Sequence, residues 1–196
     1  MGGTNIQHFV ACMKPYSSGI GAKLKAELGG LSREAFALKC LHSLQAVYIH
    51  PLQSMAGQRI DQSGIDHYTL DAEGESIVDA FQCKGFEVGD FGQSQLQQCL
   101  DSIMAFRESG YTCGAYYLIV NRYVKHPFLA KLEAALGGLV VAGKTRTATL
   151  LIPERFIEFL FARATEQLQL FFRDSLREFL TEHKERMEQD FYASDI

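Results

Sequence analysis

The chain has 196 residues, of which 47% are hydrophobic and 21% charged, values typical of a soluble globular domain with a sizeable core. No apolar run approaches the roughly 20 residues that span a bilayer, and no secretory signal is evident, so we expect a cytoplasmic protein without a membrane partner. Five scattered cysteines without a CxxC pair, and six histidines without an HExxH motif, argue against a zinc site.

The net charge of -4 is concentrated at one end of the chain. Residues 1–153 contain 13 Lys or Arg and 13 Asp or Glu, whereas residues 154–196 contain 6 and 10. An acidic protein is at first sight a poor partner for nucleic acid. Because the excess belongs to the C-terminal segment, however, the remainder can still carry local basic patches.

The first half of the chain predicts helices followed by a hairpin. A short helix is expected over Ile20–Leu28, and a better one over Ser32–Ala46, where Ser32 is the N-cap and apolar residues recur at helical spacing. Val47–Ile49 predicts a short strand. Two further strands, Ile65–Leu70 and Ser76–Lys84, flank a glycine-containing turn, which favours an antiparallel hairpin.

The second half predicts alternating helices and strands. A helix over Ser94–Glu108 should bury Leu96, Leu100, Ile103, Met104 and Phe106. After it we expect a buried strand over Ala115–Val120, a helix over His126–Leu136 closed by Gly137 and Gly138, and short strands over Leu139–Val141 and Thr147–Ile152. Together these elements predict an α/β core over residues 1–153.

A long helix is expected from Pro153 to Asp190, since Pro suits a first helical position and nothing in the following segment breaks the pattern. These 38 residues would extend about 57 Å, which is long for a domain of this size. The apolar stripe of the distal part therefore predicts a partner, either a second copy or another subunit. A helix that breaks and folds back is the alternative.

The hairpin brings three polar residues together. With the turn centred near Glu73, Asp66 lies opposite about Phe81 and so within one or two residues of Gln82. Gln82 and Lys84 share one face of their strand, because side chains alternate. A carboxylate, an amide and an ammonium are therefore expected to converge at the open end of the hairpin.

This combination suits metal-assisted hydrolysis of a phosphodiester. Mg²⁺ prefers oxygen ligands and often binds through one or two carboxylates plus water and substrate phosphate. Asp66, the Gln82 side chain and the backbone carbonyl of Cys83 are the candidate ligands, with Mn²⁺ as the alternative ion. Lys84 would orient the attacking water and stabilise the transition state.

The segments Gly64-Ile65-Asp66 and Phe81-Gln82-Cys83-Lys84-Gly85 resemble the PD-(D/E)xK superfamily of restriction-type nucleases. The resemblance is greatest to its Mrr-like branch, in which Gln often replaces the second acid. It covers about residues 20–155 and implies a restriction-endonuclease-like α/β fold, a mixed central sheet flanked by helices, here with a C-terminal helical extension. Ile65 stands where the superfamily has Pro, and Gln82 removes one negative charge, which should weaken metal binding.

The resemblance also implies a function. It implies a metal-dependent DNA endonuclease, the effector subunit of a bacterial restriction or anti-phage complex, with Asp66, Gln82 and Lys84 as catalytic residues. Glu34 is the candidate for an acid that the family often supplies from its first core helix. Residues 154–196 would then form an arm for homo-oligomers or for other subunits. A subunit that has lost catalysis and serves DNA binding or assembly is the alternative.

Two polar clusters are candidate DNA contacts. Arg122 and Lys125 follow a buried strand and could bind phosphates, or they form an ordinary polar loop. Ser94 opens a helix whose free N–H groups suit a phosphate, or it belongs to a normal capped helix start.

The segment Gly138–Thr145 satisfies the Walker A pattern, but its context is wrong. A P-loop follows a strand and opens a helix, whereas this segment follows a helix and leads into a strand. We therefore expect a hairpin turn with a solvated Lys144 rather than a nucleotide site.

Overall fold

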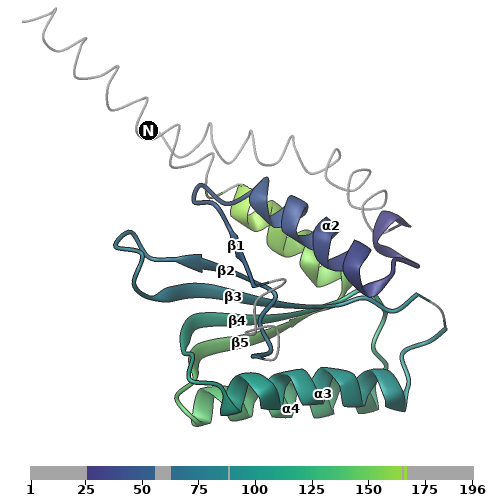
Figure 1. Ribbon diagram of the computed structural model, residues 1–196. Helices are drawn as coiled ribbons and strands as arrows, with labels where there is room; N and C mark the ends of the chain where they lie inside the picture. Colours follow the sequence, from purple (N-terminus) through teal and green to yellow (C-terminus); the bar gives the residue numbers. More distant parts are fainter. Residues whose placement is uncertain (1–25, 56–62, 88, 165, 167–196) are drawn as a thin grey trace, which may run out of the picture.

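The computed structural model describes residues 26–55, 63–87, 89–164 and 166. They form an α/β fold in which a five-stranded mixed sheet is covered by helices on both faces (Figure 1). The predicted α/β class is confirmed. The elements in chain order are α2 (Arg33–Gln45), β1 (Gln53–Ser54), β2 (His67–Leu70), β3 (Ile77–Lys84), α3 (Gln93–Glu108), β4 (Cys113–Val120), α4 (His126–Val141) and β5 (Thr145–Leu151).

The sheet has the strand order β1-β2-β3-β4-β5 and combines two kinds of pairing. The pairs β1–β2 and β2–β3 are antiparallel, so the predicted hairpin is confirmed, and β3–β4 and β4–β5 are parallel. Parallel neighbours need a crossover connection, which α3 and α4 provide. The starts of α3 and α4 therefore lie at the edge of the sheet where β3 and β4 end.

Two hydrophobic cores lie on opposite faces of the sheet (Figure 1). Ala80 and Leu118 belong to the core under α3 and α4. Phe81 and Cys83 belong to the core under α2 and residues 156–160. Since side chains alternate along a strand, Gln82 and Lys84 lie on the same face as Ala80, toward α3.

Helix α2 matches its prediction, and Ser32 caps it by accepting a hydrogen bond from the Ala35 N–H at 3.3 Å. The strand predicted over residues 47–49 is wrong. The N–H groups of Val47 and Tyr48 both bond to the carbonyl of Leu44, so the chain continues to wind after the helix. The side chains of Val47 and Tyr48 instead pack on the α2 core, and Ile49 is exposed.

Helix α4 continues to Val141, so the predicted stop at Gly137 and the strand over residues 139–141 are wrong. Leu132, Leu136 and Leu139 form one buried stripe across the two glycines, and burial of that stripe outweighs their low helix propensity. The helix ends at Val141 with Ala142 as its C-cap, and Gly143 follows with a φ of +68°, which suits a residue without a side chain.

The segment after α4 is not a hairpin turn, because β5 pairs in parallel with β4. Lys144 is half-buried rather than fully solvated, and its Nζ donates to the carbonyl of Ser109 at 2.6 Å. The lysine of the Walker-like segment thus binds the end of α3. The helix-then-strand context that argued against a P-loop is confirmed.

In α3, the predicted burial of Leu96, Ile103 and Phe106 is confirmed, whereas Met104 is 43% exposed. Met104 lies off the stripe that these three residues share, and Cys99 occupies the inward position instead.

Residues 153–164 are helical, as predicted for the start of the long helix, and the remainder of that prediction lies outside the described residues, as does the helix start at residue 20. This helix is joined to the sheet through Arg163, which forms an ion pair with Asp79 at 3.3 Å. Tyr48 donates to the same Asp79 oxygen at 2.7 Å. None of the described helices is both long and apolar enough to cross a membrane.

Candidate active site

Asp66 directly precedes β2 and lies opposite the last residues of β3. The register expected from the turn is correct at Leu70, which pairs with Ile77. An irregularity between Tyr68 and Leu70 then shifts the pairing by one residue, so that His67 rather than Asp66 lies opposite Phe81. The shift brings Asp66 level with Gln82.

Two donors from β3 hold the Asp66 carboxylate. Its Oδ2 accepts a hydrogen bond from the Cys83 backbone N–H at 2.6 Å and another from Gln82 Nε2 at 2.8 Å. The Asp66 N–H in turn donates to the Phe81 carbonyl at 2.8 Å. Backbone and side-chain bonds therefore fix the carboxylate against the strand that carries Gln82 and Lys84.

Burial and hydrogen bonding have opposite effects on Asp66. Burial raises the pKa of its carboxyl above the usual value, and this effect is the largest. The Cys83 N–H opposes the rise because it favours the ionised form, and the charges of His67, Lys84 and Arg33 act in the same direction.

Lys84 is the last residue of β3, and its side chain is almost entirely covered, with 8% exposure. Among the described residues its ammonium has no hydrogen bond, and Asp66 lies beyond the 4.0 Å of an ion pair. Burial lowers the pKa of Lys84, the nearby charge of Arg33 lowers it further, and the Asp66 carboxylate opposes both effects. Within the described part of the chain, the ammonium is thus a buried cation without an anion in contact.

The oxygens of this cluster could hold a hard cation. Within the described residues, Asp66 Oδ1 and Gln82 Oε1 accept no hydrogen bond, so both are available as ligands. The Cys83 carbonyl accepts a long bond from Gln82 Nε2 at 3.4 Å. No group of three or more His, Cys, Asp or Glu suited to a metal occurs in the described part of the chain, so a single carboxylate would carry the charge. This ligand set fits a weakly bound Mg²⁺ that keeps several waters.

The orientation of Gln82 bears on that fit. Its amide nitrogen points at Asp66, which is the favourable arrangement when no cation lies between the two groups. Metal binding by both side chains requires the amide oxygen to face the ion. The amide would therefore turn over on metal binding.

Glu34 lies in the first turn of α2 and is exposed. Its neighbour Arg33, which no sequence pattern singled out, is the α2 residue whose charge lowers the pKa of both Asp66 and Lys84. The structure therefore brings Asp66, Gln82, Cys83 and Lys84 together, whereas Glu34 is exposed at the surface of α2 and, among the described residues, has no hydrogen bond or ion pair with them.

The three candidate DNA contacts differ in their exposure and in their bonds to the rest of the protein. Arg122 donates to the carbonyls of Phe86 at 2.7 and 3.0 Å and of Glu87 at 2.6 Å, which ties its guanidinium to the segment after β3. Lys125 lies before α4 and is largely exposed, with a 3.6 Å ion pair to Asp90. Ser94 is exposed in the first turn of α3.

Asn121 supports the site from the end of the neighbouring strand. It is 4% exposed and accepts a hydrogen bond from the Phe86 N–H at 2.9 Å. Its amide nitrogen donates to the carbonyls of Leu28 at 3.2 Å and Phe86 at 3.3 Å. Asn121 therefore fixes the segment that follows Lys84, a role that a polar residue directly after a buried strand could have suggested.

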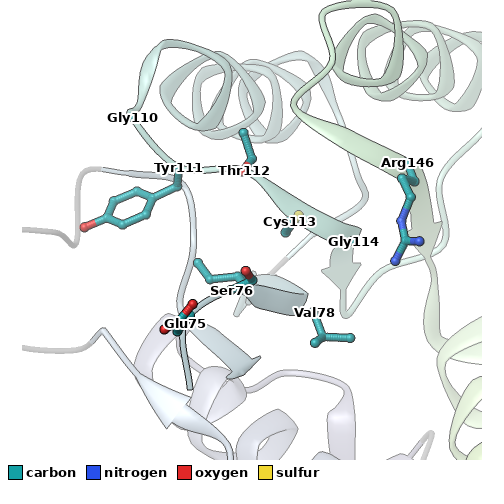
Figure 2. Close-up of a pocket in the computed structure, with 10 residues that line it drawn as sticks. Glu75, Ser76, Val78, Gly110, Tyr111, Thr112, Cys113, Gly114 and Arg146 are labelled. Carbon is teal, nitrogen blue, oxygen red and sulfur yellow. The ribbon is translucent and has the colours of Figure 1, made fainter. Parts of the chain in front are cut away.

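A separate hollow of about 430 Å³ lies at the opposite end of the strands (Figure 2). It is lined by residues at the starts of β3, β4 and β5, among them Ile77, Cys113 and Arg146. The eight residues of β3 extend about 23 Å, so this hollow is well separated from Lys84. It is not part of the candidate active site.

No family model, no curated protein and no solved structure matches this chain.

Proposed function

We propose that this protein is a metal-dependent nuclease that hydrolyses DNA phosphodiester bonds at the site formed by Asp66, Gln82 and Lys84. The observation that carries the proposal is the hydrogen-bonded hairpin end. Asp66 is bound to Gln82 and to the Cys83 backbone, and Lys84 follows on the same face of β3. A carboxylate, an amide and a buried ammonium at the end of one hairpin suit the chemistry of a phosphodiester.

The order of elements supports the same proposal. A helix, an antiparallel hairpin, a second helix and a parallel strand follow one another from α2 to β4. This is the order implied by the resemblance to the PD-(D/E)xK superfamily. We therefore assign the α/β fold to the restriction-endonuclease-like class as part of the proposal.

Each residue has a distinct task in the proposed reaction. Asp66, the Gln82 amide oxygen and the Cys83 carbonyl would hold Mg²⁺ or Mn²⁺, which when bound supplies Lewis acidity and lowers the pKa of water. The Lys84 ammonium stabilises the negative charge that develops on the phosphoryl oxygens. Hydrolysis adds one water across a P–O bond and leaves a phosphate monoester on one fragment and a hydroxyl on the other.

A second candidate function is a nuclease fold that binds DNA without cutting it. The observation that favours it is the Gln82 amide, which donates to Asp66 in a site where Gln82 is only 3% exposed. A neutral residue at that position removes charge that a second acid would give to the metal. Such a subunit would serve in DNA binding or in assembly.

The test is nicking of supercoiled plasmid with Mg²⁺ or Mn²⁺ by the wild type, Asp66→Ala, Lys84→Ala and Gln82→Glu. Arg146→Ala is the matched control, since it removes an exposed cation at the other end of the sheet. We expect the first two substitutions to slow cleavage by about 100-fold or more, as loss of one transition-state contact does, and the control to have no effect. Equal cleavage by all variants would refute the site. DNA binding without cleavage by any protein, including Gln82→Glu, would support the second candidate.

We assign residues 154–196 to protein contacts rather than to DNA, because 10 acidic residues there outnumber 6 basic ones. The partner is a second copy or another subunit of a restriction or anti-phage complex. Light scattering of the full chain would measure the first possibility, since a dimer has twice the mass of 21.9 kDa.

A further inference from the structure

The two edges of the sheet differ in what they offer to another strand (Figure 1). At one edge, β1 has only two residues, a length that provides little to pair with. At the other edge, β5 has seven residues and keeps a constant register with β4. Within the described part of the chain, no strand pairs with the outer edge of β5. Since an edge strand points the N–H and C=O groups of alternate residues away from its neighbour, β5 presents a row of them over about 23 Å.

The composition of β5 favours pairing with a further strand. Proteins that keep an edge strand single commonly place charges, a proline or a bulge in it. β5 contains no proline, and its one charged residue, Arg146, lies next to its start. Thr147 and Thr149, in the middle of the strand, are exposed, and β-branched threonine suits an extended backbone. The outer edge of β5 is therefore not protected against association by its own sequence.

Helix α4 presents an apolar surface beside this edge. Three residues connect it to β5, against which it packs, so the two elements run antiparallel at similar lengths of about 24 and 23 Å. Residues 134–143, which include the C-terminal half of α4, contain no polar side chain. Val140 and Val141 are 40% and 91% exposed. Apolar surface thus lies on the outside of α4 along the same stretch as β5.

Glu133 marks the side of α4 that faces the β5 edge. It forms an ion pair at 3.3 Å with Arg155, which belongs to the segment that follows β5. Gly137 and Val140 are four and seven residues after Glu133, so they lie on the same side of the helix. A Cβ at Gly137 would have no heavy atom within 4 Å. This side of α4 therefore has space for a second helix to approach closely.

The sequence of β5 is complementary to that of a second β5. If two copies pair in the antiparallel sense, the register that uses all seven residues is centred on Ala148. Thr147 then lies opposite Thr149 of the second copy, which is a favourable cross-strand pair. Arg146 lies opposite Leu150, so no like charges face one another. The two-fold axis of this pairing is perpendicular to the sheet and places both α4 helices side by side on the same face.

We propose that the outer edge of β5 and the Gly137 side of α4 bind a second copy of this chain, which forms a dimer with one continuous sheet. A second copy fits because one two-fold axis brings both self-complementary elements together at once. The chain has a net charge of -4, whereas the charged residues along this surface are Glu133, Arg146 and Arg155. Two copies therefore meet where the acidic excess does not oppose their approach.

The size of the surface indicates a reversible dimer. It is about 23 Å long and two layers deep, with about 10 Å for the sheet and about 10 Å for α4. The two copies together would bury roughly 900 Å², which is below the roughly 1,200 Å² at which standard interfaces begin. We therefore expect a dimer that dissociates at micromolar concentrations, in which backbone hydrogen bonds between the two strands add to the apolar contact.

The test is analytical ultracentrifugation of the full chain over a series of micromolar concentrations. Gly137→Lys places a charge between the two helices and should weaken dimerisation by about tenfold or more. Because Lys favours a helix more than Gly does, this variant should also melt at a higher temperature, so a lost dimer would not reflect unfolding. Gln98→Lys is the matched control, since it adds the same charge at an exposed position of α3 and should dimerise like the wild type.

Two double variants test the register of β5. Thr147→Lys with Thr149→Lys places like charges opposite one another and should prevent dimerisation. Thr147→Lys with Thr149→Glu places opposite charges there and should dimerise at least tenfold more tightly than the first double variant, by the roughly 1 to 2 kcal/mol that separates attractive from repulsive cross-strand pairs.

Three outcomes would overturn the inference. The first is a wild type that stays monomeric throughout the series. The second is equal dimerisation by the wild type and Gly137→Lys, because the dimer would then form elsewhere, for example through the C-terminal segment. The third is equal behaviour of the two double variants, which would exclude pairing of β5 with itself. None of these measurements depends on cleavage of DNA, so they leave the proposed nuclease activity to its own test.

Discussion

Replacing Gly64 with alanine tests how closely the start of the hairpin is packed against α3. Gly64 has a φ of +72°, a left-handed conformation that costs a residue with a side chain about 1–2 kcal/mol. A Cβ here would also collide with the Ser102 carbonyl oxygen. It would lie 3.0 Å from the Phe106 nitrogen and 3.1 Å from its Cβ. Overpacking of this kind costs about 1–3 kcal/mol more, so we expect a loss of about 2–5 kcal/mol in the free energy of unfolding.

Gly74 provides the matched control in the turn of the same hairpin. Its φ of +76° is nearly identical, but no heavy atom lies within 4 Å of the position of a Cβ. Gly74→Ala should therefore show the cost of the conformation alone, about 1–2 kcal/mol. The difference between the two variants isolates the cost of the missing space.

Urea unfolding followed by circular dichroism measures both variants on one scale, provided that the slopes with denaturant agree. Gly64→Ala should also reduce plasmid nicking, because Gly64 lies two residues before Asp66 and its carbonyl accepts a hydrogen bond from Tyr116 at 2.8 Å. Equal losses of stability for the two variants would refute the packing argument.

Three further predictions concern residues around the site. Asn121→Ala should cost about 1–3 kcal/mol of unfolding free energy in the same urea assay, because it leaves buried backbone groups without partners, whereas Gln97→Ala on the surface of α3 should cost little. Lys144→Met should lower the melting temperature, because it removes the hydrogen bond to the Ser109 carbonyl. Calorimetry should detect no ATP binding to either the wild type or this variant. ATP binding by the wild type alone would restore the P-loop hypothesis. Burial raises the pKa of Cys99 to about 12 and of Cys113 to about 11, so in native protein both should resist iodoacetamide at pH 8, as judged by mass spectrometry, and react after unfolding. In the folded protein the pKa values of both thiols exceed the ordinary value of 9.0. We therefore also expect the free energy of unfolding to fall as the pH rises above about 9, because the thiols then ionise only in the unfolded chain.

The sequence predicted the hairpin because its signals are local. Alternating apolar residues and a glycine turn specify which strands pair, and they placed Asp66 within one residue of its actual level. The one-residue error has a definite cause in the irregularity between Tyr68 and Leu70. Nothing in the local pattern marks that irregularity.

Features that depend on distant segments were not predicted. The start of α2 packs directly over Gly85, a contact between segments far apart in the sequence that no local pattern reveals. The continuation of α4 through Gly137 depends on the burial of Leu139, which the sequence alone does not show. In both cases tertiary packing outweighed the local preference.

The bond from the Cys83 N–H to Asp66 also has a consequence for the order in which the chain folds. It joins residues 17 positions apart within a hairpin, and hairpins of this kind form in about 1–10 μs. The parallel pairs that β4 and β5 add require longer crossovers, and such non-local contacts form more slowly. The groups proposed to bind the metal are therefore expected to meet early, before the second half of the sheet has assembled around them.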